Sequence, residues 1–490
     1  MNMKKTLNTF LFILIALNAF GQLKFAEVFQ DNMVLQANKE IQIWGEGKPS
    51  SEFKISLDKK AVNVKVNKDG KWSVSFPKMK YGGPYELKAE GNETITYKNV
   101  MVGEVWFCAG QSNMRWFVRD ANNPREEIKN SSNYSNIRFL AMPLSGSDTP
   151  KTEVKAKWEV CSSTTIKNKT AVGYFFGKEL SDNLKGVAIG LIDISYGGAS
   201  ISTFMDAETI KNSPEIEGIE RRNKNFLAHY HKQKKKWDEN PEGKAPYFPE
   251  NCLGSYCFND MIHPLIPYTV QGMIWYQGET NAGEPKPYIT WYGEFVGMMR
   301  KHFKNENMPT YFVQLAGFKG VKGREMQNES WAMFRLAQAE CLKFENTGMA
   351  TAMDVGEAHD IHPRNKQEVG RRLSLLALRD TYKKKVIAEG PTVKSYKVDN
   401  NKLIITFDNV AKQLTTSDGK DEVIGFAVRN DEGKLDAISA KIIGKNKVEV
   451  NLQGNNLIMY AYAKFPECNL YNSANLPATP FNLNIDQMLN

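Results

Sequence analysis

The strongest constraint on the fold is a set of continuous apolar runs in the middle of the chain. Each has the length of one strand and lacks the alternation of polar and apolar residues seen in half-exposed strands; the runs are 102–109, 187–194, 272–276 and 310–315. Such runs are typical of strands buried on both faces of a parallel sheet. Helical spacing in residues 174–184 and 331–344 supplies the crossovers that parallel strands require. We therefore expect residues 101–389 to form an α/β domain, with a parallel sheet flanked by helices.

The two ends of the chain have a different periodicity. Apolar and polar residues alternate in short segments such as 41–44, 53–57 and 403–407, as in half-buried strands. We expect an N-terminal β domain over residues 22–100 and a C-terminal β module over residues 390–490, both sandwich-like. A polar, basic insertion at about 206–250 is expected to be helical and to border the active site.

Residues 1–21 have the features of a signal peptide. Lys4 and Lys5 precede an apolar run, 10–17, that is too short to span a bilayer. Ala19 and Gly21 fit cleavage before Gln22. The rest of the sequence contains no apolar stretch long enough to span a membrane. The sequence thus predicts a secreted or periplasmic protein without a membrane span.

Charge and histidine placement weigh against two other classes of function. The formal charge of +9 is mild for 490 residues, and no dense stripe of Arg and Lys occurs, so we expect no nucleic-acid partner. His229 and His231 have a spacing suited to metal ligands on a strand, but their segment reads as a solvated helix. We therefore expect no metal site.

One serine and one histidine are the leading catalytic candidates. Ser112, within Gly110-Gln111-Ser112-Asn113-Met114, directly follows an apolar run and is expected at the carboxyl edge of the sheet, where α/β folds bind ligands. A serine hydroxyl needs a base to become a nucleophile. His362, in Asp360-Ile361-His362-Pro363, is the leading base, and Asp360 is its expected acid. Asp354 and Glu357 are alternatives to Asp360. The pattern predicts acyl transfer through a covalent intermediate.

Acyl transfer also needs hydrogen-bond donors for the oxyanion. The backbone N–H of Ser112 is one candidate. The segments 195–198 and 276–281 also follow apolar runs, so they should converge on the same sheet edge. The second segment offers Gln277, or Asn281 as an alternative, as a side-chain donor.

These motifs together resemble the sialate O-acetylesterase branch of the SGNH (GDSL-like) hydrolases. The matching blocks are 110–114, 195–198, 275–281 and 360–366, with further likeness at 31–36 and 469–478. The resemblance implies a flavodoxin-like catalytic domain with flanking β modules. It also implies removal of O-acetyl groups from sugars by a serine acyl-enzyme, without a cofactor.

Carried over by position, the resemblance makes Ser112 the nucleophile and His362 the base. The oxyanion hole would be formed by Ser112, Gly198 and Gln277, the last standing where the superfamily has Asn. Gln111 and Glu279 are expected to contact the substrate. The superfamily pattern D-x-x-H would require an acid at the position of His359, so either Asp360 completes a triad or the site is a Ser–His dyad.

Several alternatives remain open at this point. The predicted substrate is an O-acetylated sugar or glycan, most simply an acetylated sialic acid. Acetylxylan or another acetylated polysaccharide is the alternative substrate. A non-catalytic carbohydrate-binding protein is the alternative of another class, since the chain is rich in aromatic residues. The oligomeric state is not predicted.

Overall fold

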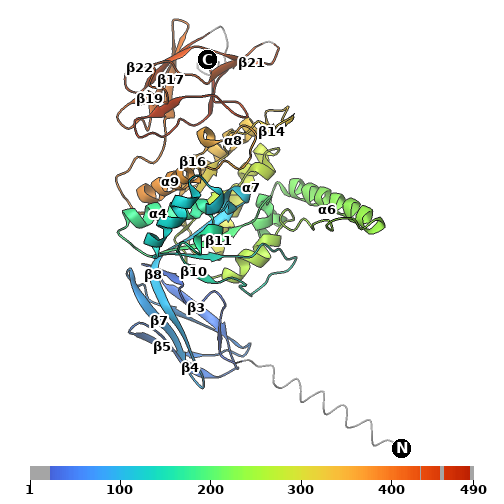
Figure 1. Cartoon of the computed structure of the whole chain (residues 1–490), viewed down its shortest axis with the longest axis vertical. Helices are drawn as coiled ribbons and strands as arrows, with labels where there is room; N and C mark the ends of the chain where they lie inside the picture. Colours follow the sequence, from blue (N-terminus) through green and yellow to red (C-terminus); the bar gives the residue numbers. More distant parts are fainter. Residues whose placement is uncertain (1–21, 431, 453–456, 486–490) are drawn as a thin grey trace, which may run out of the picture.

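A computed structural model describes residues 22–430, 432–452 and 457–485. The predicted signal peptide, residues 1–21, lies outside the described residues. The chain forms three parts stacked along the long axis of the molecule (Figure 1). β-strands from the amino-terminal residues lie at one end, helices and strands lie in the middle, and β-strands from the carboxyl-terminal residues lie at the other end.

The middle part is built on a predominantly parallel sheet. In spatial order its strands are β10 (Trp158–Val160), β9 (Ile137–Ala141), β11 (Ile189–Ser195), β8 (Thr94–Gly110), β12 (Gly272–Tyr276), β13 (Thr310–Gln314) and β16 (Thr347–Thr351). All neighbouring pairs on this path are parallel except β10 and β9. The four apolar runs thus form β8, β11, β12 and β13, and their residues are almost all buried.

Helices cover both faces of this sheet. Trp106 and Phe107 are consecutive in β8 and therefore point to opposite faces. Trp106 packs edge-on against Phe176 of α4 (Ala171–Asn183), whereas Phe107 packs against Phe303 at the end of α7 (Pro285–His302). The remaining α-helices are α2 (Ser112–Arg115), α3 (Pro124–Asn130), α5 (Ala207–Asn212), α6 (Ile216–Glu239), α8 (Ser330–Glu340) and α9 (Lys366–Leu376).

The long strand β8 joins the amino-terminal part to the middle part. Its first half pairs antiparallel with β7, and its second half pairs in parallel with β11 and β12. The other amino-terminal strands are β1 (Lys24–Phe25), β2 (Val34–Gln36), β3 (Ile41–Glu46), β4 (Glu52–Leu57), β5 (Lys60–Lys65), β6 (Lys71–Phe76) and β7 (Gly82–Glu90). The expected domain boundary between residues 100 and 101 falls inside β8. The periodicity changes there because the first half of β8 pairs with the partly exposed β7, whereas its second half lies between the buried strands β11 and β12.

The carboxyl-terminal part has its own hydrophobic core. One sheet contains β17 (Thr392–Asp399), β18 (Lys402–Asp408), β23 (Lys447–Asn451) and β22 (Ala440–Ile443), and another contains β21 (Leu435–Ala437), β20 (Phe426–Arg429), β24 (Leu457–Tyr460) and β26 (Phe481–Asn484). A smaller pair in this part is β19 (Leu414–Thr416) with β25 (Leu470–Asn472), whereas the pair β14 (Gly320–Val321) and β15 (Arg324–Glu325) belongs to the middle part, between β13 and α8. The prediction of helices around a sheet, accompanied by further β sheets, is confirmed.

The insertion at 206–250 contains α5 and the long helix α6, which projects away from the rest of the molecule (Figure 1). Only Gly218, Ile219 and Arg222 of α6 are buried. Across the described ranges, we find no helix that combines the length and the apolar character needed to cross a membrane.

Candidate active site

Ser112 lies where the carboxyl ends of the central strands converge. It is the first residue of α2, two residues after the end of β8. At Gly110 the backbone adopts φ +135°, and a Cβ there would lie 2.1 Å from the carbonyl oxygen of Tyr276. Only glycine permits this close approach. The end of β8 is thus held against the end of β12, which places Ser112 beside the segment that follows β12.

The structure brings Ser112 and His362 together from distant parts of the sequence. The Nε2 atom of His362 lies 2.8 Å from the Oγ atom of Ser112, within hydrogen-bonding distance for proton transfer. The indole of Trp116 stacks on the imidazole, with ring centroids 4.9 Å apart and an interplanar angle of 18°. Trp116 was not identified from the sequence, since a tryptophan four residues after a serine carries no specific signal of such stacking.

Asp360 lies near the imidazole but does not bond to it. Its Oδ1 accepts the backbone N–H of His362 at 2.8 Å, while His362 Nδ1 is 3.8 Å away. The carboxylate therefore acts on the imidazole as a nearby negative charge rather than as a hydrogen-bond partner. This geometry is intermediate between the triad and the dyad that the sequence left open.

The other carboxylate candidates are engaged elsewhere. Asp354 accepts two hydrogen bonds from the Arg372 guanidinium, at 2.6 and 2.7 Å, and Glu357 accepts the backbone N–H of Arg364. His359, which occupies the place of the acid in D-x-x-H, has its Nδ1 3.0 Å from the carbonyl oxygen of Gly320. Among these residues Asp360 alone has a carboxylate recorded near His362.

The surroundings of His362 favour its neutral form. Burial lowers the pKa of His362 below its ordinary value, and the nearby Lys366 ammonium lowers it further, whereas Asp360 opposes the shift. A lowered pKa keeps the imidazole unprotonated at neutral pH, so Nε2 can accept the Ser112 proton.

Two backbone N–H groups, those of Ser112 and Gly198, have no backbone acceptor among the described residues. As the first residue of α2, Ser112 has an N–H without an intrahelical acceptor. Gly197 lies against Ser112, since a Cβ built on Gly197 would be 3.9 Å from the Ser112 Cβ. The N–H of Gly198 has no recorded acceptor within the described ranges. Gly198 adopts φ +71°, and its carbonyl accepts the Thr280 hydroxyl at 2.9 Å. The loop that carries Gly198 is therefore held through a carbonyl group, and the Gly198 N–H stays available to bind an oxyanion.

Gln277 and Asn281 are buried beneath this loop and bonded to it. The Gln277 amide donates to the Ala199 carbonyl at 3.1 Å and to Asn281 Oδ1 at 2.7 Å. Asn281 Oδ1 also accepts the backbone N–H of Ile201. Both side chains hold the loop that carries Gly198.

Gln111, one of the two expected substrate contacts, is also used inside the protein. It is buried, and its Oε1 accepts the backbone N–H groups of Gly278 and Thr280 at 3.3 and 3.4 Å. The side chain therefore connects the segment before Ser112 to the segment after β12.

Asn113 connects the nucleophile and base segments through a buried polar network. Its amide nitrogen donates to Glu279 Oε1 at 2.5 Å and to the Ile361 carbonyl at 2.9 Å, and its oxygen accepts from Lys366 Nζ at 2.5 Å. Burial lowers the pKa of Lys366 to about 7 and raises the pKa of Glu279. Glu279, the other expected substrate contact, is thus part of this network.

This buried polar network was not predicted from the sequence. Lys366 follows His362 by four residues, within a motif that carried the resemblance. Lysine is rarely fully buried, so nothing in the pattern indicated that its ammonium group would lie beneath the active site.

His229 and His231, the two histidines considered as metal ligands, do not form a metal site. His229 and His231 are exposed on α6, and residues two apart on a helix do not face each other. The described residues contain no group of three or more His, Cys, Asp and Glu side chains positioned to hold a metal ion.

Comparisons with known proteins agree with this architecture. Residues 249–378 match the family "Carbohydrate esterase, sialic acid-specific acetylesterase". The chain is 27% identical to human sialate O-acetylesterase over 512 residues, which cover 94% of this chain and 92% of the relative. It is also 27% identical to the mouse enzyme, with 94% of each chain covered.

A solved structure shows the same similarity in three dimensions. A carbohydrate acetylesterase from Xanthomonas citri superposes with a TM-score of 0.82 and 29% identity, over 94% of this chain and 99% of that one. The predicted enzyme class is confirmed: the chain is an esterase hydrolase, and it resembles the sialate O-acetylesterases over nearly its whole length.

Proposed function

We propose that this protein is a serine carbohydrate O-acetylesterase that works through an acyl-enzyme at Ser112. The observation that carries the proposal is the 2.8 Å contact between Ser112 Oγ and His362 Nε2, placed beside unbonded backbone N–H groups at the carboxyl edge of a parallel sheet. This is the arrangement that activates a serine and stabilises an oxyanion.

In the proposed mechanism, Ser112 Oγ attacks the acetyl carbonyl carbon while His362 Nε2 takes the hydroxyl proton. The N–H groups of Ser112 and Gly198 stabilise the negative oxygen of the tetrahedral intermediate. His362 then gives its proton to the departing sugar oxygen, which leaves Ser112 acetylated. Water attacks this ester while His362 Nε2 takes a proton from it. The bond between the acetyl carbon and Ser112 Oγ then breaks, His362 returns the proton to Ser112 Oγ, and acetate leaves. Asp360 stabilises the imidazolium formed in both steps.

We also propose the finer fold assignment. The path β11-β8-β12-β13-β16 follows the strand order 2-1-3-4-5 when these strands are numbered along the chain, which is the flavodoxin-like order. Strand β9 extends this sheet beyond β11. The amino-terminal strands divide between the sheet β1-β3-β6 and the extension of the central sheet through β7 and β8, and the carboxyl-terminal part contains two four-stranded sheets. We propose that both parts are sandwich-like modules, at about 22–100 and 390–490.

A cavity that reaches the catalytic pair through Trp116 supports an acidic sugar as substrate. It has a volume of about 460 Å³ and is lined by Trp116, which stacks on His362, and by Arg119, Asp120 and Arg364. The Arg119 guanidinium bonds to Asn168 and pairs with the Asp120 carboxylate at 3.5 Å. The exposed Arg364 guanidinium has no recorded partner among the described residues. Sialic acids carry a carboxylate, which a free guanidinium binds in a bidentate manner, and an unsubstituted xylan backbone does not.

Replacing Arg364 by glutamine is expected to raise KM for an O-acetylated sialic acid about tenfold, since a charge-assisted hydrogen bond contributes roughly 1.5–3 kcal/mol. Turnover of a small aryl acetate should stay unchanged, because that substrate has no carboxylate. Arg125→Gln, which removes the same charge from an exposed position on α3, is the matched control. An equal rise of KM for acetylated xylan would contradict the assignment of Arg364 to carboxylate binding.

The proposed activity is tested by acetate release from 9-O-acetylated sialic acid, acetylated xylan and an aryl acetate. A fluorophosphonate probe, mapped by mass spectrometry, should label Ser112. Acetate release from the sialic acid alone supports the assignment as a sialate O-acetylesterase. Acetate release from xylan instead supports the alternative substrate, an acetylated polysaccharide. A folded protein that neither releases acetate nor reacts with the probe would refute the serine mechanism.

We further propose that the protein is exported after cleavage before Gln22. The basis is the charged and apolar pattern of residues 1–21. Amino-terminal sequencing of protein recovered from the periplasm or medium should begin at Gln22. Recovery of the uncleaved chain from the cytoplasm alone would count against export.

A further inference from the structure

A second cavity lies at the opposite edge of the central sheet from Ser112. It has a volume of about 690 Å³, within the range of pockets that bind small ligands. One wall is the sheet formed by β1, β3 and β6, and the other includes Ile266, Pro267 and Lys304. Those three residues precede β12 and β13, at the amino ends of the parallel strands, whereas Ser112 follows the carboxyl end of β8. The cavity is therefore separate from the proposed active site.

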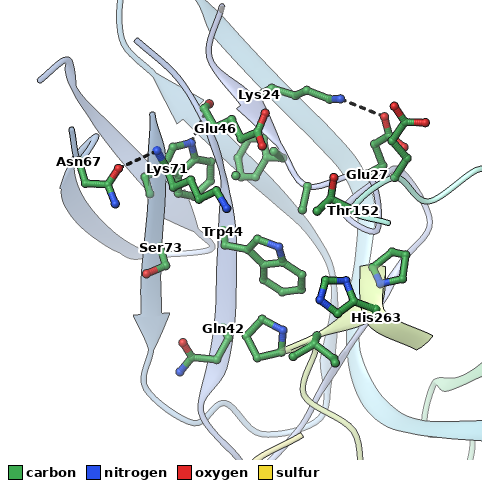
Figure 2. A pocket seen from close by; sticks show the side chains of 18 of the residues that line it. Lys24, Glu27, Gln42, Trp44, Glu46, Asn67, Lys71, Ser73, Thr152 and His263 are labelled. Carbon is green, nitrogen blue, oxygen red and sulfur yellow. Dashed lines mark hydrogen bonds and ion pairs between the residues drawn. The ribbon is translucent and has the colours of Figure 1, made fainter. Parts of the chain in front are cut away.

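Alternation along β3 and β6 gives the cavity a polar wall around one tryptophan. Ile41 and Ile43 face the hydrophobic core, so the side chains between and after them face outward. In the antiparallel register Trp44 is opposite Ser73, and Glu46 is opposite Lys71. Figure 2 shows the Trp44 indole in the cavity, with Gln42, Ser73 and Lys71 around it.

The Trp44 ring is held in place by packing, but part of its surface is exposed and its indole N–H is not hydrogen-bonded within the described ranges. It packs edge-on against the buried Phe29, with centroids 4.7 Å apart, and is half-buried. Its indole N–H has no recorded acceptor within the described ranges. A rigid aromatic surface with an unused polar group is suited to a ligand that is apolar on one face and polar at its edge.

The opposite wall contributes a fixed imidazole. His263 Nδ1 lies 2.7 Å from the Lys151 carbonyl oxygen. Nδ1 must carry the proton in this bond, so the neutral ring presents Nε2 as an acceptor. Figure 2 shows the His263 ring directed into the cavity near Trp44.

The charges around the cavity largely cancel. Lys24 is paired with Glu27 at 3.0 Å, and Lys65 is paired with Glu52 at 3.0 Å. Glu46 stands across the strand pair from Lys71. A strongly charged ligand would therefore gain little here, whereas a neutral ligand with many hydroxyl groups finds both donors and acceptors.

We propose that this cavity binds a neutral oligosaccharide, with one sugar ring stacked on Trp44 and its hydroxyls bonded to Gln42, Glu46, Lys71 and His263. The apolar C–H face of a pyranose covers the indole, and its hydroxyl edge meets the polar groups. The site would hold a glycan chain at a distance from Ser112. It does not depend on the acyl-enzyme, so binding can be tested independently of esterase activity.

The test uses the full protein and unacetylated xylohexaose, cellohexaose and mannohexaose, with 3′-sialyllactose as a charged comparison, in calorimetric titrations. We expect at least one neutral hexasaccharide to bind. Ser73→Arg, which fills the cavity without removing packing, should weaken binding at least tenfold, and Trp44→Ala should do the same. Thr94→Arg, an exposed position at the start of β8 that does not line the cavity, is the matched control.

Both cavity variants should hydrolyse an aryl acetate at the wild-type rate, and Ser112→Ala should bind the hexasaccharide as well as the wild type. This combination distinguishes loss of the sugar site from loss of the esterase. The proposal is overturned if none of the neutral sugars binds, if Ser73→Arg binds as the wild type does, or if the charged trisaccharide alone binds.

Discussion

Replacing Ser112 by alanine is expected to lower kcat/KM for an acetylated sugar by about 10⁴-fold or more, because the variant has no nucleophile for the acyl-enzyme. The serine hydroxyl has one recorded side-chain partner, His362 Nε2, so its loss should leave the fold intact. The measurement is acetate release under saturating and subsaturating substrate, together with the thermal unfolding midpoint.

A matched control for this substitution is Ser330→Ala. Ser330 is also the first residue of a helix, α8, and among the described residues its hydroxyl bonds only to the exposed side chain of Asn328. This variant should keep wild-type activity. Residual turnover in Ser112→Ala within tenfold of the wild type would contradict the acyl-enzyme, and so would labelling of that variant by the fluorophosphonate probe.

The position of Ser112 could be predicted because a parallel strand that is buried on both faces has a recognisable sequence pattern. The run at 102–109 is apolar without alternation, and such strands end at the edge where ligands bind. His362 followed from the motif rather than from periodicity. Its closeness to Ser112 depends on a crossover that brings residues 250 positions apart into contact, which local patterns do not encode.

The roles of the polar residues around the pair were harder to predict. Gln277 and Asn281 have side chains suited to an oxyanion hole, yet in the structure both bond to the loop at 199–201. An amide gives the same sequence signal whether it bonds to substrate or to backbone. Likewise, alternation stops inside β8 because the strand passes from the partly exposed β7 to the buried strands β11 and β12. In the sequence alone this change is indistinguishable from a domain boundary.

Replacing Lys366 by methionine is expected to lower the free energy of unfolding by about 3 kcal/mol, since it removes the buried donor to Asn113 and the positive charge that favours the buried Glu279 carboxylate. Lys366 Nζ donates to Asn113, which in turn donates to Glu279. The double variant Glu279→Gln/Lys366→Met should recover most of the loss, because it removes both charges. Urea denaturation measures the effect, and Lys167→Met, an exposed lysine, is the control.

The same substitution should move the pH dependence of catalysis. Neutral His362 is the base, so kcat/KM rises as pH increases through the pKa of His362, which burial and the Lys366 charge lower below its ordinary value. Without the Lys366 charge the pKa of His362 rises, and the acidic limb of the profile shifts to higher pH. A merely structural role for Lys366 would lower stability without moving this limb. Wild-type stability together with an unmoved limb would show that the network has no influence on the catalytic pair.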